Sequence, residues 1–430
     1  MERAYATAPW TVPSHTAMFT GRLAGELGLD QAPGGDPRSI PAALQPVRDE
    51  LLGAVLKRAG YRCHGYSANL WLSSHTGLDG GFDEFSYLPS ERVLPTEQGL
   101  PARLRWAREG IRARRDAGAA MISAALKDSI ASAEPGQPSF WFVNLVECHS
   151  PYMPPKPWND LGALERARAA LDSHRHLGFE SICLNAAGRD LVPAASIARM
   201  RHLYRRAISY MDAWLGDVLG ALAAREMLDN TLVLVTADHG ESFGENGLLA
   251  HGFSVAEQLI HVPLIGAGPG ITGLVASNTA GAFSLASIPF VIAEAAGIEG
   301  HPYTAGNGVA IARSEAICAP DDERMLRFAD RWDLNEGEIA RLSTGFTAAT
   351  DGVSKLVVTD DGRESLIDLV NHRGEQSPAV AGAGVARLRE ALAGIALADR
   401  PALAAPGPAG DADAETIAVL EQQMKLLGYM

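Results

Sequence analysis

Two patterns of apolar and polar residues follow one another along much of the chain. From Leu203 to Leu222 the apolar positions recur mostly every three or four residues, which predicts an amphipathic helix. After a turn at Asp229 and Asn230, the β-branched run from Thr231 to Thr236 predicts a strand. The short, mostly apolar run from Phe140 to Val146 predicts a central strand that is buried on both faces.

The same alternation is present nearer the amino terminus. Glu50 to Arg58 has a helical pattern that ends at Gly60, and Tyr61 to Ser67 has the pattern of a strand. Helices and strands that alternate in this way predict an α/β fold with a doubly wound, mostly parallel sheet. Ligands of such sheets bind beyond the carboxyl ends of the strands, so polar residues that follow a strand are candidates for chemistry.

The pattern changes after about residue 305. Gly352 to Thr359 and Glu364 to Leu369 flank the turn Asp360-Asp361-Gly362, which predicts an antiparallel hairpin in a small sheet. Farther on, a Pro/Ala/Gly-rich linker precedes an amphipathic segment. We therefore predict three parts: an α/β domain over residues 1–305, a C-terminal α+β subdomain over residues 306–399, and a linker with a terminal helix over residues 400–430.

Composition and charge limit the kinds of molecule that this protein is expected to bind. The net charge of −14 argues against nucleic acid or an anionic membrane as a partner, because both need clustered positive charge. A small anionic substrate stays possible, since it responds to the local field of one site. The charge-free stretch from Val262 to Ala293 is interrupted by prolines and glycines, so we expect a strand, loops and a short helix there. Four scattered cysteines and the absence of an apolar leader favour a cytoplasmic protein; the oligomeric state is left open.

Two predicted strands end in polar, titratable residues. Asp238 and His239 directly follow the strand that ends at Thr236, and a carboxylate beside an imidazole is a suitable pair of ligands for a divalent ion. His251, 12 residues after His239, is able to fold back to the same site. His149 follows the strand that ends at Val146 and is able to bind an anion or protonate a leaving oxygen. The structural alternatives are a capping aspartate and loop histidines.

A third polar cluster lies at residues 10–15 (WTVPSH). Pro13 is suited to the first position of a helix, which places Thr11 at or just before the helix start. The N–H groups and dipole of a helix start attract a tetrahedral anion, and a hydroxyl activated there by a metal is a good nucleophile. The alternative is that Thr11 only caps the helix.

In order and together, these segments resemble the sulfatase family of the alkaline phosphatase superfamily. The resemblance rests on residues 8–21 (APWTVPSHTAMFTG), 60–69, 77–85 (GLDGGFDEF), 144–155 (NLVECHSPYMPP), 229–263 and 355–375. It implies a metal-dependent hydrolase of phosphate or sulfate esters that forms a covalent threonine intermediate. It implies that Asp238, His239 and Thr11 hold one divalent ion. It further implies Thr11 as the nucleophile, His251 at the ester oxygens, His149 at the leaving group, and Asn69 and His15 as substrate-binding residues.

The chain departs from the family's pattern in two ways that matter. Thr11 stands where sulfatases that use formylglycine have Cys or Ser, which favours phosphate over sulfate esters and zinc or manganese over calcium. Only ten residues precede Thr11 and none is Asp, whereas the family begins with a strand that carries metal-binding aspartates. We expect that the chain is a truncated form. The alternatives are a degenerate relative that acts in binding, or a phosphoethanolamine-type transferase, although those enzymes carry membrane helices.

Overall fold

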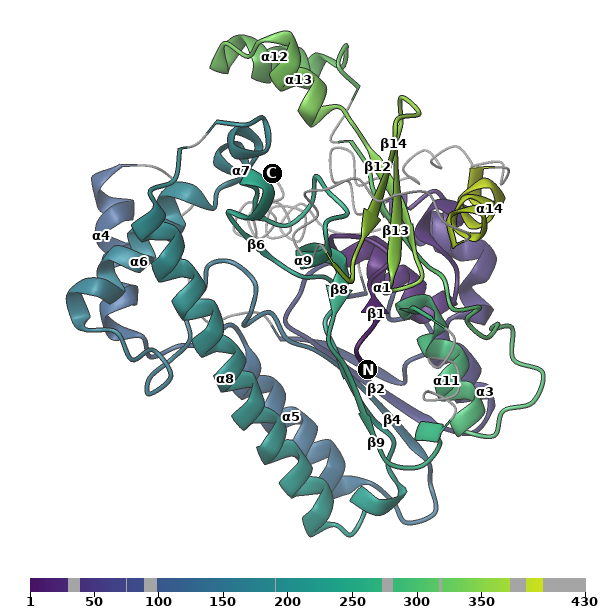
Figure 1. Cartoon of the computed structure of the whole chain (residues 1–430). Helices are drawn as coiled ribbons and strands as arrows, with labels where there is room; N and C mark the ends of the chain where they lie inside the picture. The colour runs from purple at the N-terminus through teal and green to yellow at the C-terminus, as the bar shows by residue number, and fades with distance from the viewer. Residues whose placement is uncertain are drawn as a thin grey trace. The chain divides into compact units, whose positions relative to one another are not determined.

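The computed structural model describes residues 1–29, 39–74, 76–88, 99–189, 191–272, 281–316, 319–371 and 384–396. The predicted linker and terminal helix at 400–430 lie outside these residues. Contacts divide the described residues into two compact units. Unit 1 contains residues 1–55, 230–242 and 251–396, and unit 2 contains residues 56–229 and 243–250. Figure 1 labels the elements of both units.

Unit 2 contains a three-stranded parallel sheet. Its middle strand is β2 (Arg62–Ser67), with β3 (Glu84–Tyr87) on one side and β4 (Ser139–Asn144) on the other. β4 confirms the strand predicted at 140–146, but all six of its residues are half-buried, so the predicted burial on both faces is wrong. The physical reason is its place: within this sheet β4 has one strand neighbour, and β2 takes the central position.

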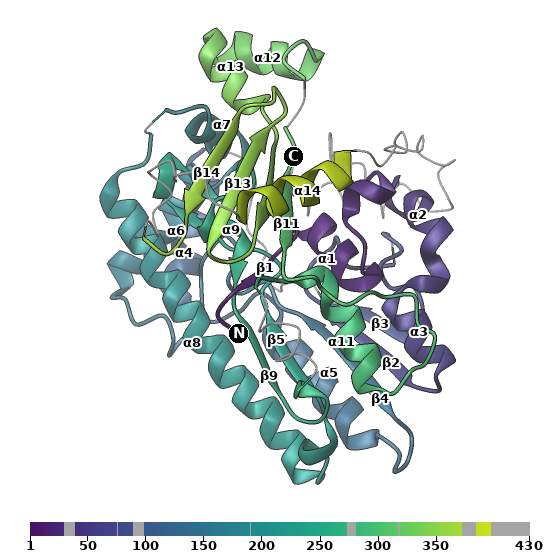
Figure 2. The same ribbon diagram turned by 45° about the vertical axis from the view of Figure 1, so that its right-hand side comes forward.

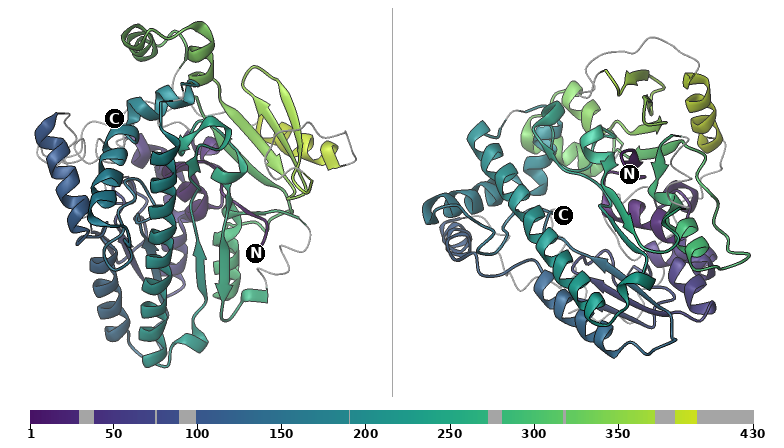
Figure 3. Two further views of the ribbon diagram at one scale, coloured as in Figure 1. Left: turned by 60° about the vertical axis from the view of Figure 1, so that its left-hand side comes forward. Right: turned by 60° about the horizontal axis from the view of Figure 1, so that its bottom comes forward.

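Helices cover this sheet. α5 (Ala119–Ser132) and α8 (Ala194–Ala224) run side by side (Figure 1), and the long ribbon of α8 is seen from two further directions in Figure 3. Ile122 and Leu126 of α5 share one buried cluster with Val218 and Leu222 of α8, which confirms the predicted apolar stripe of the longer helix. The other helices of unit 2 are α4 (Leu100–Arg112), α6 (Ala163–His176) and α7 (Phe179–Ala186).

Unit 1 is built around short strands and one buried helix (Figure 2). β1 (Ala4–Tyr5) pairs in parallel with β10 (Phe283–Ser284) and antiparallel with β8 (His261–Val262). The strand predicted at 231–236 is β5 (Val233–Thr236), which pairs antiparallel with β9 (Leu264–Ala267). α1 (Thr11–Thr20) contributes Met18 to an apolar core that includes Phe283 and Leu285, next to α11 (Ile288–Ala295). Unit 1 also contains the shorter helices α2 (Ser39–Leu44) and α9 (Glu257–Ile260), and α3 (Leu52–Arg58) begins in unit 1 and ends in unit 2.

The C-terminal part of unit 1 is a four-stranded antiparallel sheet. The strands run in the order β11 (Ala310–Ser314), β12 (Phe346–Thr350), β13 (Ser354–Thr359) and β14 (Glu364–Asp368), and β13 and β14 confirm the predicted hairpin. α14 (Gly384–Ala396) lies along this sheet, where Leu388 packs against Ala349 and Leu356. Two helices, α12 (Glu323–Trp332) and α13 (Glu336–Leu342), connect β11 with β12.

The fold class predicted from the sequence is confirmed: the molecule is α/β, with a parallel sheet and a small antiparallel sheet toward the C-terminus. The charge-free stretch after Val262 contains β9 and leads into α11, as predicted. Within the described ranges, no helix is both long enough and apolar enough to cross a membrane. The division at residues 305 and 399 stays a prediction.

Candidate active site

The predicted nucleophile lies at the start of a fully buried helix. α1 begins at Thr11, two residues earlier than the start predicted at Pro13, so proline occupies its third position. This is tolerated because the first-turn N–H groups of a helix have no acceptor within the helix. The capping position belongs to Trp10, which has extended backbone, so Thr11 is not the cap. All ten residues of α1 are buried, and Gly21 closes the helix with a φ of 71°.

One face of α1 is turned toward the loop that follows β5. Thr11, Ser14 and His15 share this face, because residues three and four apart lie above one another on a helix. The Ser14 hydroxyl donates to the Asp238 carbonyl oxygen over 2.6 Å. His15 Nδ1 lies 3.0 Å from the Thr11 carbonyl oxygen and 3.4 Å from Asp238 Oδ2. Both neighbours accept, so Nδ1 carries the proton, and His15 links the helix start to the Asp238 carboxylate.

The loop after β5 follows a path that only glycine permits at position 240. The Gly240 N–H donates to the Leu259 carbonyl oxygen over 2.7 Å. A Cβ at this position would lie 2.0 Å from the Gln258 carbonyl oxygen, well inside contact distance. The close backbone approach fixes the direction in which Asp238 and His239 leave the strand.

Two imidazoles and two carboxylates gather around this loop. His239 and His251 lie with their ring centroids 4.3 Å apart, which realises the predicted return of His251 to the loop. His251 Nδ1 is 3.0 Å from Glu241 Oε1, and His239 Nε2 is 3.6 Å from Asp238 Oδ2. His239 Nδ1 lies 2.9 Å from the Gly240 carbonyl oxygen, so Nδ1 holds the proton and Nε2 of the neutral ring is an acceptor.

Burial and neighbouring charge shift the pKa values of these groups in different directions. Burial lowers the pKa of both His15 and His239, and the attraction of Asp238 offsets this only in part. Burial also lowers the pKa of His251, but Glu241, through charge and hydrogen bond, raises that pKa above its usual value. Burial raises the pKa of Asp238, while His239, His15 and His251 lower it more, so that this carboxyl has a reduced pKa.

The side chains of Asp238 and His239 offer two possible ligand atoms for a divalent ion. Asp238 Oδ2 and His239 Nε2 are both acceptors and face each other at 3.6 Å. Two ligands about 2.1 Å from a tetrahedral ion are about 3.4 Å apart, so this pair suits a divalent ion between them. In the part of the chain that the structure describes, no three His, Cys, Asp or Glu side chains are grouped to hold a metal ion. Asp238 and His239 therefore fit a divalent ion as one pair of ligands.

Two predicted site residues belong to unit 2, so the arrangement within unit 1 does not include them. Asn69 follows β2, and its Oδ1 accepts the Trp71 N–H over 3.0 Å in a local turn. His149 follows β4, and its Nδ1 lies 2.8 Å from the Ser150 carbonyl oxygen. Next to His149, Glu147 accepts the N–H groups of Ala117 and Ala119, where α5 begins. Local hydrogen bonds thus hold these side chains at the ends of their strands.

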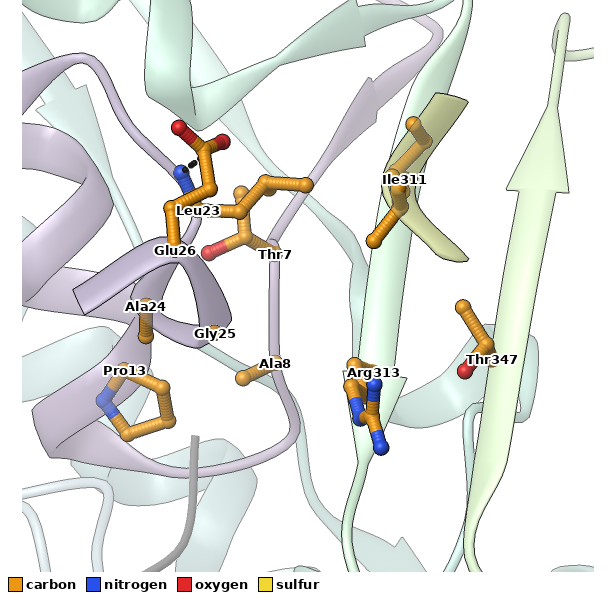
Figure 4. A pocket seen from close by; sticks show the side chains of 11 residues that line it. Thr7, Ala8, Pro13, Leu23, Ala24, Gly25, Glu26, Ile311, Arg313 and Thr347 are labelled. Atoms are coloured by element: carbon orange, nitrogen blue, oxygen red, sulfur yellow. Dashed lines mark hydrogen bonds between the residues drawn. The ribbon is translucent and has the colours of Figure 1, made fainter. Parts of the chain in front are cut away.

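A separate small pocket lies beside α1 (Figure 4). It is lined by Thr7, Pro13, Glu26, Ile311, Arg313 and Thr347, with other short side chains. The Thr7 hydroxyl has no hydrogen-bond partner among the described residues, and Arg313 is paired with Glu315. None of the side chains gathered around Asp238 lines this pocket, so it is distinct from the polar cluster.

Two members of the cluster were not among the residues predicted from the sequence. Ser14 anchors the Asp238 backbone, and Glu241 holds His251. Ser14 is spaced three residues from Thr11, which predicts a shared helix face, and Glu241 lies in the same polar run as Asp238. Those signals existed, but the partner of Ser14 lies 224 residues away, and that of Glu241 is ten residues away across a chain reversal.

Comparison with known proteins agrees with the fold class. The family model named Sulfatase matches residues 1–287. Choline-sulfatase of Rhizobium meliloti (strain 1021) is 40% identical over 80 residues, which is 19% of this chain and 15% of that protein. Iduronate 2-sulfatase of Homo sapiens is 30% identical over 151 residues, 31% of this chain and 27% of that protein. The matched segments thus span less than a third of either relative.

Solved structures show the same fold over most of the chain. The phosphonate monoester hydrolase of Agrobacterium radiobacter superposes with a TM-score of 0.57 at 18% identity, covering 92% of this chain and 87% of that one. Because the family model covers more than half of the residues, and the motifs lie in the same order, the resemblance seen in the sequence is confirmed. The chain belongs to the sulfatase family of the alkaline phosphatase superfamily.

Proposed function

We propose that this protein hydrolyses esters of sulfate or of phosphorus oxyacids, with Thr11 as the nucleophile. The observation that carries the proposal is the attachment of α1 to the Asp238 loop through Ser14 and His15. It puts the start of a buried helix beside a carboxylate and two imidazoles. Family membership supports the reaction class, as do relatives named for sulfate ester hydrolysis and a structural neighbour named for phosphonate monoesters.

The start of α1 favours an anionic group. First-turn N–H groups point out of the helix, and the helix dipole adds partial positive charge at the same end. His251 lies beside His239, and Glu241 raises its pKa, which favours its positively charged form. Together these groups are suited to the non-bridging oxygens of a tetrahedral ester.

The chemistry then follows from Thr11. Its Oγ1 attacks the sulfur or phosphorus atom, a new bond to the threonine oxygen forms, and the bond to the leaving oxygen breaks. The hydroxyl proton passes to solvent, and the leaving oxygen takes up a proton and departs as the alcohol. A water oxygen then bonds to the sulfur or phosphorus atom, the bond to the threonine oxygen breaks, and sulfate or the phosphorus oxyacid leaves as the hydroxyl is restored. We predict, from the sequence, that His149 protonates the leaving oxygen and that Asn69 and His15 contact the transferred group.

Asp238 and His239 would hold one divalent ion, for which we propose zinc or manganese, because His239 offers a nitrogen ligand. When bound, such an ion would lower the pKa of a nearby hydroxyl and neutralise ester charge. The chain's own contribution is to hold the acceptor pair Asp238 Oδ2 and His239 Nε2 in place. Gly240 and Ser14 do this through the backbone.

The proposal is tested with three chromogenic substrates: 4-nitrophenyl sulfate, 4-nitrophenyl phosphate and a 4-nitrophenyl phosphonate monoester. We expect turnover of at least one after incubation with zinc or manganese, and its loss after chelation. Thr11→Ala should lower kcat by about 10³-fold or more, because no covalent ester can form. Thr11→Ser keeps a hydroxyl and should keep measurable turnover.

Full activity of Thr11→Ala with an unchanged fold would reject the threonine mechanism. If the wild-type protein turns over none of these substrates yet binds inorganic sulfate or phosphate, a binding role replaces the hydrolase. Elemental analysis of protein purified without chelators tests the metal independently of turnover.

A further inference from the structure

Lys355 of the C-terminal sheet has a completely buried side chain. It lies on β13, and none of its surface is exposed. Its Nζ donates to the Val255 carbonyl oxygen and to Glu257 Oε1, the latter over 3.2 Å. Burying an ammonium group is costly unless acceptors replace its water, so these two contacts are what make the position tolerable.

Glu257 connects this buried charge to the first strand of unit 1. Its Oε2 accepts the Tyr5 hydroxyl over 3.3 Å, and Tyr5 lies in β1, six residues before Thr11. The Tyr5 ring stacks on His261, with centroids 5.1 Å apart, and these two residues are paired partners of β1 and β8. Burial and Glu257 raise the pKa of Tyr5, so its hydroxyl stays protonated and continues to donate.

We call residues 255–260 the anchor segment. Backbone carbonyl groups of this segment also form hydrogen bonds with two other parts of the site. The Leu259 carbonyl oxygen accepts the Gly240 N–H over 2.7 Å, next to Asp238 and His239. The Ile260 carbonyl oxygen accepts the Ala6 N–H over 2.8 Å, in the strand that leads into α1. His251 lies four residues before the first residue of the segment. Three contributors to the cluster are therefore tied to one short segment.

We propose that Lys355 is a positioning residue of the active site: by holding Val255 and Glu257, it keeps the anchor segment where the Asp238 loop, the β1–α1 connection and His251 meet. The C-terminal sheet is then a part of the catalytic apparatus and not an appendage. The effect of Lys355 on catalysis rests on the proposed function. That Lys355 holds the anchor segment in place is measurable without turnover.

The main test is Lys355→Met, which keeps the length of the side chain and removes its charge. Peptide-level hydrogen exchange should accelerate at least about tenfold around residues 4–8 and 237–241, where Ala6 and Gly240 donate to the anchor segment. The ladder between β11 and β12 should keep its protection. In kinetics, kcat should fall about 10- to 100-fold with KM changed less than about threefold, because binding groups remain but their alignment is lost.

The matched control is Arg363→Met in the same hairpin, where Arg363 pairs with exposed Asp361. It removes one positive charge of the same subdomain and should leave exchange and kinetics unchanged. If Lys355→Met does not fold, the double variant Lys355→Met with Glu257→Gln removes both members of the buried pair. It should fold and show the same local acceleration of exchange.

Two results would overturn the inference. One is unchanged exchange at 4–8 and 237–241 in a folded Lys355 variant. The other is acceleration spread evenly over unit 1, which is the signature of general destabilisation. If the wild-type protein lacks ester hydrolysis, the proposed function fails, but the exchange pattern still decides whether Lys355 positions this cluster.

Discussion

Two strand ends of this protein have similar sequences and different structures. β5 is followed by Asp238 and His239, and β4 is followed by Glu147 and His149. After β5, the side chains face His15 of the distant helix α1 and the pair Glu241–His251, which follows in the next residues of the chain. After β4, Glu147 and His149 form hydrogen bonds with backbone groups of α5 and of the neighbouring residue.

The difference shows which surroundings make a carboxylate and an imidazole suited to catalysis. Around Asp238, mutual charge and burial lower the pKa of Asp238, His15 and His239 and raise that of His251. Glu147 is buried more deeply than Asp238, and one of its oxygens accepts the two backbone N–H groups where α5 begins. A polar strand end thus becomes part of a charged cluster where other segments bring titratable side chains to it.

Asp238→Asn and Glu147→Gln test this comparison most directly. Asp238→Asn removes the charge that faces His15 and His239 Nε2, so kcat/KM should fall about 10²- to 10³-fold. Glu147→Gln keeps an oxygen acceptor for Ala117 and Ala119, so kcat/KM should stay within a few-fold while the free energy of unfolding falls by about 1 kcal/mol. Steady-state kinetics and urea unfolding of both variants measure these effects. Equal losses of activity would show that the two strand ends do not differ in their importance for catalysis.

Gly240→Ala tests whether the loop after β5 depends on close backbone approach. The new Cβ would meet the Gln258 carbonyl oxygen at 2.0 Å, so we expect a loss of about 1–3 kcal/mol in unfolding free energy and a fall in kcat. Gly216→Ala on the exposed side of α8 is the control. Nothing lies within 4 Å of its Cβ position, and alanine should stabilise the helix by up to about 1 kcal/mol.

The comparison would be weakened if thermal or urea unfolding ranked these two glycine variants equally. It would be strengthened if Gly240→Ala lost more activity than its loss of stability explains.

Ser14→Ala is expected to have the smallest effect. It removes the 2.6 Å hydrogen bond to the Asp238 carbonyl oxygen from a fully buried position, which should cost about 1 kcal/mol of unfolding free energy. Because His15 still reaches Asp238, kcat should fall only a few-fold. A loss of activity as large as that of Asp238→Asn would show that the backbone attachment, and not the carboxylate, is what matters.

Much of the fold was predictable because its elements carry their own periodicity. The apolar stripe within α8, the β-branched run of β5 and the turn between β13 and β14 are local signals, and the structure confirms each. The start of α1 was predicted two residues too late, since Pro13 suits several first-turn positions equally. Full burial of β4 was wrongly predicted, because an apolar run does not reveal which strand takes the middle of a sheet.

The sequence by itself determined the fold class, the family resemblance and the candidates Thr11, Asp238, His239 and His251. It could do so because these follow from local patterns and from motifs in a fixed order. Only the tertiary structure decided which polar and charged groups lie close enough to interact. The link of Ser14 to Asp238 joins α1 to the loop after β5, and that of Lys355 to Glu257 joins β13 to α9. The link of Glu241 to His251 closes a span of ten residues. Hydrogen bonds and pKa shifts depend on distances of a few ångströms, and those distances are set by chain packing.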